Sequence, residues 1–218
     1  MDLAALYRFR FVPGEQAGKI RVWQTLCAGF FQPLIGEDKT ILDLACGYGE
    51  FINAIQARHK IAVDMNPDVP NYLQPNIEVV QSPADAIPLN DALVDVVFTS
   101  NFLEHLADKA ECDRVFAEVR RLLRPGGRFI IMGPNIRYLA DRYWDFYDHH
   151  LPLSHLSLEE GLVQAGYSVD RVIPRFLPYT AKSALPKHPA LVALYLKVPL
   201  AWRVLGRQFL VVASKPLS

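Results

Sequence analysis

The segment ILDLACGYGEF places a carboxylate, Asp43, at the end of an apolar run and follows it with Gly47 and Gly49. Glycines at this spacing allow a tight backbone turn and a close approach of the main chain to a ligand. A second carboxylate, Asp64, ends the next apolar run, where it can accept hydrogen bonds from ribose hydroxyls. A Gly-x-Gly sequence alone can be a tight turn that binds no ligand. Together with both acids, it indicates a nucleoside-containing ligand.

The residue types around this turn bear on which nucleoside is bound. A dinucleotide site usually has a third glycine three residues after the second, and here that position is Ile52. Asp43 would also repel a pyrophosphate. S-adenosylmethionine (SAM) carries no phosphate, and its positive amino group favours a nearby carboxylate. The pattern therefore favours SAM over NAD, and an NAD-dependent enzyme is kept as a rival.

Strand-like and helix-like segments alternate through the middle of the chain and would position these residues. Short apolar runs predict strands at Thr40–Leu44, His59–Asp64, Ile77–Gln81, Val94–Ser100 and Arg128–Met132. Further predicted elements are helices at Glu50–Arg58, at Asp108–Leu123 and at Ser157–Ala165 with Ser157 as N-cap, and strands at Ser168–Ile173 and Gln208–Ser214. This alternation predicts an α/β fold with a doubly wound, mostly parallel sheet.

Five segments together resemble a known family. They are ILDLACGYGEF, IAVDMNP, ADAIPL, VDVVFTSNFLEHL and RLLRPGGRFIIMGPN. In order and spacing across residues 38–135, they resemble the successive motifs of class I SAM-dependent methyltransferases. The resemblance implies an enzyme that uses S-adenosyl-L-methionine. It also implies a Rossmann-like, three-layer α/β/α fold whose seven-strand sheet has an antiparallel last strand, consistent with the terminal QFLVVAS.

The resemblance also implies a set of cofactor-binding residues, namely Asp43, Ala45, Gly47, Gly49, Asp64, Met65, Asp85, Ala86 and Asn101. The first four would surround the methionine part of SAM, and Asp64 would bind the ribose. Met65 would pack on the adenine, and Asp85 with Ala86 would reach the adenine amino group. Asn101 would line the methyl-transfer site. The family often has glycine where Ala45 stands, so one extra methyl narrows the pocket here.

Several of these positions also have a purely structural interpretation. Asp85 is equally a turn or capping residue before Ile87 and Pro88. Asn101 is a candidate N-cap for a helix over residues 102–106. We expect Cys46 to be a small buried side chain and not a nucleophile.

Methyl transfer to oxygen benefits from a general base, which is worth about 10²–10⁴-fold in rate. Ligands of such sheets bind at the carboxyl ends of the strands, so the base should follow the fourth or fifth strand. Our first candidate is His150, followed by His149 and His105. We predict no metal site, because no known ligand spacing is matched by Asp145, Asp148, His149, His150 and His155.

Charge is distributed unevenly along a chain whose formal net charge is zero. Residues Arg171–Ser218 contain eight Lys or Arg and no Asp or Glu. Within them lies an apolar, basic insert, 175–207, in which Lys197, Pro199 and Arg203 disfavour a membrane span. Two short helices there could form a lid, a dimer contact or a peripheral contact with an anionic membrane. We expect an anionic or lipid-linked acceptor. Nucleic acid is disfavoured, because the basic residues are diluted among aliphatic side chains with few aromatic residues available to stack on bases.

The whole chain, 1–218, is expected to be one domain. A helical cover (1–37) would precede the SAM-binding core (38–135) and an acceptor-side region (136–218). Scattered Cys27, Cys46 and Cys112 favour the cytoplasm, and arginines interrupt the N-terminal apolar stretch, which is too short for a signal peptide. The predicted function is methylation, on oxygen, of a small-molecule, sugar or lipid-linked acceptor. The alternative is a SAM-binding scaffold or regulatory protein without turnover.

Overall fold

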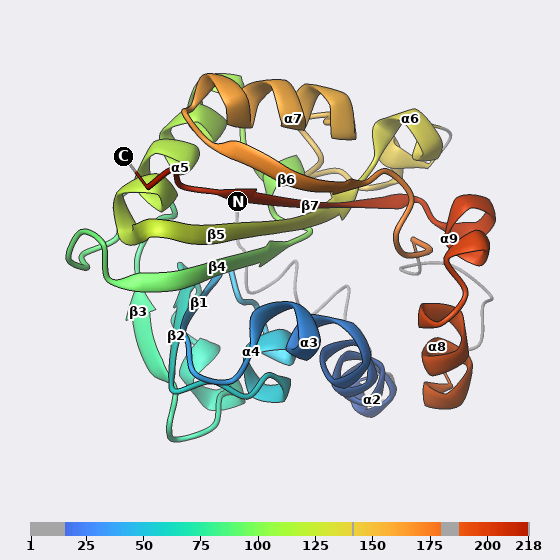
Figure 1. Cartoon of the computed structure of the whole chain (residues 1–218), viewed down its shortest axis with the longest axis horizontal. Helices are drawn as coiled ribbons and strands as arrows, with labels where there is room; N and C mark the ends of the chain where they lie inside the picture. Colours follow the sequence, from blue (N-terminus) through green and yellow to red (C-terminus); the bar gives the residue numbers. More distant parts are fainter. Residues whose placement is uncertain (1–15, 141, 180–187, 218) are drawn as a thin grey trace.

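The computed structural model describes residues 16–140, 142–179 and 188–217 and contains a seven-stranded sheet (Figure 1). Its strands are β1 Thr40–Leu44, β2 His59–Asp64, β3 Glu78–Gln81, β4 Val94–Ser100, β5 Leu123–Pro134, β6 Ser168–Ile173 and β7 Gln208–Ser214. Their spatial order is β3-β2-β1-β4-β5-β7-β6. Strand β7 runs antiparallel to β5 and β6, and the other pairs are parallel. The predicted doubly wound sheet with an antiparallel last strand is confirmed.

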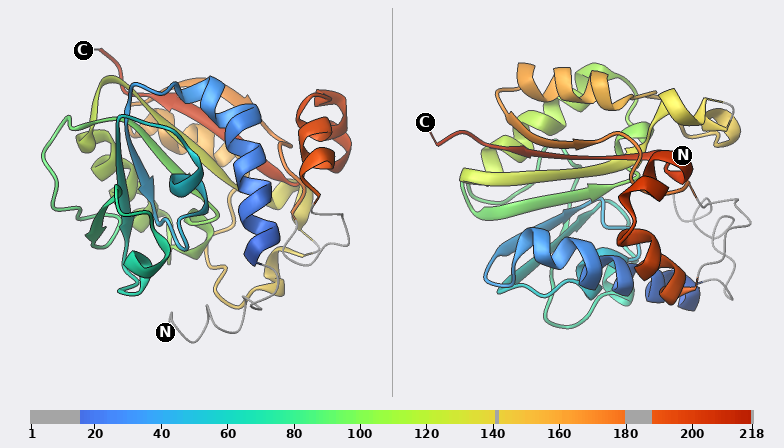
Figure 2. Two further views of the ribbon diagram at one scale, coloured as in Figure 1. Left: turned by 90° about the horizontal axis from the view of Figure 1, so that it is seen from below. Right: turned by 45° about the vertical axis from the view of Figure 1, so that its right-hand side comes forward.

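Helices cover both faces of this sheet and make three layers (Figures 1 and 2). One face carries α2 Gln16–Leu26, the π-helical turn η1 Cys27–Phe31, α3 Gln32–Ile35 and α4 Glu50–Ala54. The other carries α5 Lys109–Leu122 and α7 His155–Gln164. The shorter elements are η2 Val69–Tyr72, η3 Leu103–His105, α6 Ile136–Leu139, η4 Tyr143–Asp145, α8 Pro189–Leu196 and α9 Pro199–Leu205.

Each face of the sheet buries its own apolar core, because successive side chains of a strand point to opposite faces. Leu42 and Leu44 of β1 pack with the α5 and α7 side chains. Ile41 belongs to the core beneath α2 and α4, together with Phe98 of β4. Strands buried on both faces explain the nearly continuous apolar runs in the sequence.

Five strands have the predicted bounds, and the remaining elements differ at their ends. The helix after Gly49 ends at Ala54, not at Arg58, because Ile55 is extended (φ −78°, ψ 144°) and fully buried. Helix α7 begins at His155, since Ser154 accepts a hydrogen bond from the Ser157 N–H. Ser157 therefore completes a capping box and is not the N-cap.

The carboxyl ends of β4 and β5 lie on one side of the molecule, where α6, α8 and α9 gather (Figure 1). Helix α8 packs beside α2, which runs across the sheet (Figure 2). The insert does contain two short helices, and Arg175 ties them to the core by donating to the Val204 and Gly206 carbonyls. Residues 1–15 of the predicted helical cover (1–37) lie outside the described residues.

Candidate functional site

The tips of β1 and β2 lie side by side, as a shared ligand site requires. Leu44 pairs with Val63 in the parallel ladder. Beyond the ladder, the Cys46 N–H donates to the Val63 carbonyl at 3.1 Å. The Gly47 N–H donates to Asp64 Oδ2 at 2.8 Å. The two acids predicted from the sequence therefore lie close together, at the ends of adjacent strands.

The turn after β1 is built from left-handed backbone. Ala45, Gly47 and Gly49 have φ values of 55°, 55° and 69°. A Cβ on Gly49 would fall 2.1 Å from Leu73 Cδ2, so the backbone approaches its neighbour closely there. Ala45 adopts this conformation although it has a Cβ, at a cost of roughly 1–2 kcal/mol. Such strain is characteristic of functional loops.

Asp43 is the most buried acid of this turn, with 3% of its surface exposed. Burial raises the pKa of its carboxyl well above the usual value of 3.8, and the nearby carboxylates of Glu50 and Asp64 add to the effect. A hydrogen bond from the Ile52 N–H, at the start of α4, acts in the opposite direction. Two further acids near a buried carboxyl favour a cationic ligand group.

The Asp64 carboxylate accepts hydrogen bonds from the turn after β1 and from the loop after β2. Its Oδ2 accepts from the Gly47 N–H, and its Oδ1 accepts from the Asn66 N–H at 2.9 Å. Carboxylate oxygens have further lone pairs, so ribose hydroxyls can still donate to Asp64. Met65 follows with 57% of its surface exposed, which leaves its side chain available to a flat apolar group.

The other predicted cofactor residues lie after β3 and β4. Asp85 pairs with Arg114 of α5 at 3.0 Å, and Ala86 is exposed. Asn101 is exposed at the end of β4 with φ 51°, and its N–H donates to the Met132 carbonyl. The turn η3 begins after Phe102 without a side-chain cap, so the N-cap interpretation of Asn101 is wrong.

Two of the three candidate bases meet, although they lie far apart in the sequence. The ring centroids of His105 and His149 are 5.2 Å apart. His105 Nδ1 lies 3.1 Å from Asp148 Oδ2 and 2.9 Å from the Asp148 carbonyl. Burial acts to lower the pKa of His105, but Asp148 and Glu104 outweigh it and the pKa is raised. His150, our first candidate, has an exposed side chain.

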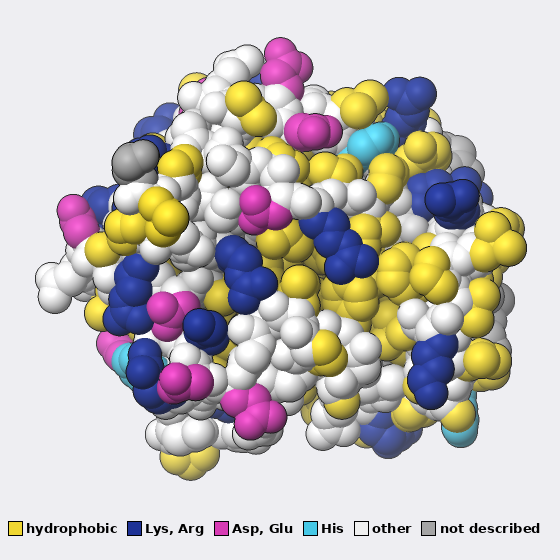
Figure 3. Space-filling view, viewed as in Figure 1, with side chains coloured by type: hydrophobic (Ala, Val, Ile, Leu, Met, Phe, Trp, Pro, Cys, Tyr) yellow, Lys and Arg dark blue, Asp and Glu magenta, His cyan; other side chains and the backbone are white. Residues whose placement is uncertain are grey.

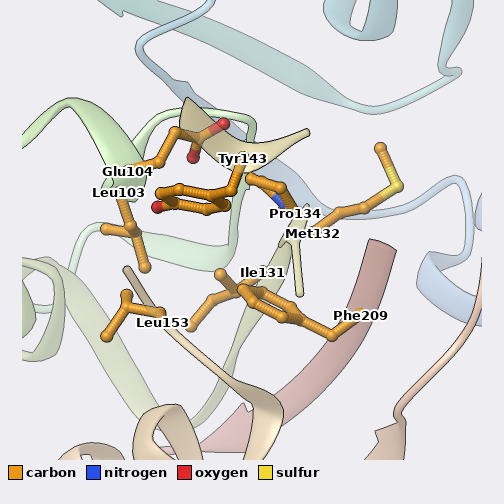
Figure 4. Close-up of a pocket in the computed structure, with 9 residues that line it drawn as sticks. Leu103, Glu104, Ile131, Met132, Pro134, Tyr143, Leu153 and Phe209 are labelled. Carbon is orange, nitrogen blue, oxygen red and sulfur yellow. The ribbon is translucent and has the colours of Figure 1, made fainter. Parts of the chain in front are cut away.

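Glu104 is the functional candidate that the sequence interpretation missed. Its carbonyl accepts hydrogen bonds from the His150 N–H at 2.8 Å and the Leu151 N–H at 3.1 Å, which joins the two loops. Its buried side chain lines a small pocket beside the ring of Tyr143 (Figure 4). The available signal was its position next to His105, directly after a strand with a predicted site at its end.

The aromatic residues of the loop after β5 divide into two groups. Tyr143 is fully buried and donates to the Leu151 carbonyl at 2.5 Å. Phe146 stacks on His149 with ring centroids 4.9 Å apart. Trp144 and Tyr147, in contrast, are exposed. The rings of Tyr143 and Phe146 therefore hold His149 in place, and the exposed rings of Trp144 and Tyr147 are accessible to a ligand.

Comparison with known proteins points to one family. A family model described as "Methyltransferase domain" matches residues 42–131. A probable S-adenosylmethionine-dependent methyltransferase of Mycolicibacterium smegmatis is 31% identical over 145 residues, which are 63% of this chain and 55% of that protein. The ubiquinone/menaquinone biosynthesis C-methyltransferase UbiE of Brucella anthropi is 28% identical over 130 residues, 53% of this chain and 48% of that protein. The chain spans about half the length of these relatives.

Solved structures show the same fold. A SAM-dependent methyltransferase from Archaeoglobus fulgidus superimposes with a TM-score of 0.67 at 21% identity, over 98% of this chain and 100% of that one. Its similarity extends beyond the matched domain to both ends of the sheet. These similarities show a methyltransferase domain over residues 42–131 and, for the chain as a whole, the fold of a SAM-dependent methyltransferase, and they support S-adenosyl-L-methionine as the cofactor.

Proposed function

We propose that the protein transfers the methyl group of SAM to an oxygen of a small-molecule, sugar or lipid-linked acceptor. The observation that carries this proposal is the meeting of two sites at one edge of the sheet. Acids and glycines gather at the tips of β1 and β2. Histidines and carboxylates gather after β4 and β5.

The strand-tip residues suit SAM. Buried Asp43, with Glu50 and Asp64 nearby, offers negative charge to the amino group of the methionine part. The left-handed turn from Ala45 to Gly49 brings backbone close to the ligand. When bound, SAM supplies an electrophilic methyl group on a positively charged sulfur.

The acceptor side supplies candidate bases. Asp148 holds His105 through Nδ1, which leaves Nε2 to take a proton, the usual arrangement of a base and its orienting carboxylate. His149 lies against His105, and His150 lies exposed at the rim of the same loop. We propose that one of these three imidazoles takes the acceptor proton as the oxygen–methyl bond forms and the methyl–sulfur bond breaks. Together, positioning and proton transfer account for the chemistry such a site has to perform.

The insert supports an amphiphilic acceptor. Several apolar side chains of α8, α9 and their link are exposed, namely Leu191, Leu194, Val198, Leu200, Val204 and Leu205. Apolar and basic side chains share this side of the molecule, and no acidic side chain is visible among them on the face shown (Figure 3). Among the described residues, no helix is both long and apolar enough to cross a bilayer. Because exposed apolar side chains lie together with basic ones on α8 and α9 (Figure 3), we propose peripheral contact with an anionic membrane, in preference to a purely internal lid or a dimer contact.

The activity is tested with methyl-labelled SAM and a panel of hydroxylated acceptors that includes sugar phosphates and polyprenyl phosphates. We expect SAM binding by calorimetry, and release of the demethylated cofactor with label in the acceptor. Mass and NMR analysis of the product distinguish oxygen from carbon methylation, the type named for the UbiE relative. SAM binding without turnover across the panel would favour the scaffold alternative, and absence of SAM binding would refute both.

A further inference from the structure

We propose that Glu104, His105 and His149 form a binding site for a divalent transition-metal ion on the acceptor side. One potential ligand atom from each of the three residues lies within 4.8 Å of the other two. Ligand atoms bound at about 2.0–2.2 Å from one ion lie less than about 4.4 Å apart. Small side-chain rotations therefore bring the three atoms to coordination distance. Only the site's role in methyl transfer rests on the proposed function.

The hydrogen bonding of His105 Nδ1 is compatible with metal binding through Nε2. Its Nδ1 is held by the Asp148 carboxylate at 3.1 Å and by the Asp148 carbonyl at 2.9 Å. A histidine that binds a metal usually donates its other ring N–H to a carboxylate or a backbone carbonyl, which fixes the tautomer. The Nε2 lone pair of His105 is then available for the ion. Asp148 is itself buried, so this orientation is firmly held.

The remaining two ligands are prearranged by the loop after β5. Backbone hydrogen bonds from His150 and Leu151 to the Glu104 carbonyl fasten this loop to η3. The ring of His149 is packed between those of Phe146 and Tyr143, with centroids at 4.9 and 4.8 Å. A site held by rigid neighbours loses little entropy when it binds an ion.

Charge and burial also favour a cation here. Glu104 and Asp148 bring two carboxylates into a region where both side chains are almost wholly buried. Desolvation of carboxylates is costly unless nearby positive charge compensates it. A divalent ion bound by Glu104 would add positive charge to this buried acidic region.

The donor set indicates the kind of metal. Two imidazoles and one carboxylate suit Zn²⁺, Fe²⁺, Co²⁺ or Mn²⁺, whereas Mg²⁺ and Ca²⁺ prefer oxygen ligands. Three protein ligands leave coordination positions open, as in catalytic zinc sites. An acceptor hydroxyl bound there becomes more acidic. Because His105 and His149 would then be ligands, His150 is the remaining imidazole among our candidate bases.

The site is tested on the full chain after treatment with a chelator. We expect one equivalent of Zn²⁺ to bind by calorimetry and Co²⁺ to give visible ligand-field bands. Loss of a hydrogen-bond partner of a metal ligand weakens metal binding by about 10–100-fold. Glu104→Gln and His149→Gln remove ligands themselves, so each should weaken Zn²⁺ binding by at least this much. Asp148→Asn should weaken it by about 10–100-fold while leaving all three ligands in place. This third variant keeps the test valid if a ligand substitution prevents folding.

Two matched controls define specificity. His150→Gln removes the neighbouring exposed imidazole, and His59→Gln removes a histidine paired with Glu78 at 3.0 Å on the opposite half of the sheet. Both should bind Zn²⁺ as the wild type does. The proposal is overturned if the folded wild type binds neither ion, or if Glu104→Gln, His149→Gln and Asp148→Asn bind Zn²⁺ with wild-type affinity.

Metal binding and methyl transfer can fail separately. Zn²⁺ binding by a chain that never turns over SAM supports the site and refutes the proposed activity. Turnover that is unaffected by removal of the metal supports the activity and overturns the role of the ion in it.

Discussion

Burial of the Asp43 carboxyl lowers the stability of the folded protein, whereas its negative charge would favour binding of a cationic ligand group. Its pKa is raised in the folded protein, so the fold binds this proton more tightly than the unfolded chain does. The stability that comes from the protonated form is therefore lost as the pH rises from about 4 through the folded-state pKa. Because its pKa is raised, the Asp43 carboxyl makes the ligand-free protein less stable at neutral pH, and a bound cationic group would offset this cost.

The substitution Asp43→Asn should raise the stability of the folded protein and lower its affinity for SAM. At neutral pH we expect the ligand-free variant to be more stable to denaturant, by about 1–3 kcal/mol, because the desolvation cost of a buried charged carboxyl is removed. The gain should be small near pH 4 and grow toward pH 8. SAM affinity should fall about 10–100-fold, equivalent to one charge-assisted hydrogen bond. Denaturant titrations at several pH values and calorimetry measure both effects.

Asp38→Asn is the matched control, because Asp38 lies on the surface and its ion pair with Arg58 is loose, at 3.6 Å. Neither its stability nor its SAM affinity should change measurably. A wild-type SAM affinity in Asp43→Asn would contradict the assignment of Asp43 to the cofactor.

Ala45 is the one position where the turn departs from the family pattern, and it can be tested by restoring glycine. Ala45→Gly relieves roughly 1–2 kcal/mol of left-handed strain, and the more flexible unfolded chain takes back about 0.4–1 kcal/mol. We expect a net stabilisation of about 0.5 kcal/mol in chemical denaturation. Ala117→Gly, in the exposed interior of α5, should instead lose about 1 kcal/mol. An equal loss of stability in Ala45→Gly and Ala117→Gly would contradict the backbone strain at Ala45.

The sequence predicted the grouping of residues at the tips of β1 and β2 better than the grouping of residues after β4 and β5. Asp43, Gly47 and Asp64 lie within one β-α-β unit, formed by β1, α4 and β2, where chain order and spatial order agree. Glu104 and His149 come from different loops, and only the folded chain brings them together. No local periodicity carries that information, so the ranking of the histidines from the sequence rested on position alone.

Among the elements, strands were predicted more accurately than helix ends. A buried parallel strand is an apolar run bounded by polar residues, so its limits are visible in the sequence. Helix ends depend on side-chain hydrogen bonds between nearby residues. Both Ser154 and Ser157 are reasonable N-caps in the sequence, and the structure has Ser154 at the cap with Ser157 in the first turn.

This N-cap gives an element-scale prediction. Ser154→Ala removes the acceptor for the Ser157 N–H and should lower the free energy of unfolding by about 1 kcal/mol. Urea denaturation followed by circular dichroism measures the change. Ser168→Ala, at the exposed start of β6, should stay within about 0.5 kcal/mol of the wild type. An unchanged stability in Ser154→Ala would show that α7 is held by packing alone.

At the scale of the whole molecule, the basic residues near the C-terminus gather on one side of the structure. The basic C-terminal quarter contributes α8 and α9, which lie where β4 and β5 end (Figure 1). The exposed apolar residues of these helices lie near Lys197, Arg203 and Arg207. An amphiphilic acceptor held at a membrane surface would thus be presented to the same edge of the sheet as the cofactor.

Co-sedimentation with vesicles tests this arrangement. The protein should bind vesicles that contain phosphatidylglycerol more tightly than pure phosphatidylcholine, and added salt should weaken the binding, because charge attraction is screened. Lys197→Gln should weaken binding about fivefold, since one basic residue near the surface contributes about 1 kcal/mol. Leu200→Asp should weaken it by about 10-fold or more, because an inserted leucine contributes about 1.5–3 kcal/mol.

Val163→Asp places the same charge on an exposed apolar position of α7, away from α8 and α9, and should bind vesicles as the wild type does. Equal losses in Val163→Asp and Leu200→Asp would mean that added negative charge, and not this surface, governs binding. Wild-type protein that ignores anionic vesicles at low salt would remove the membrane from the proposal. The exposed leucines of α8 and α9 would then belong to a protein–protein contact, and the acceptor would have to reach the site from solution.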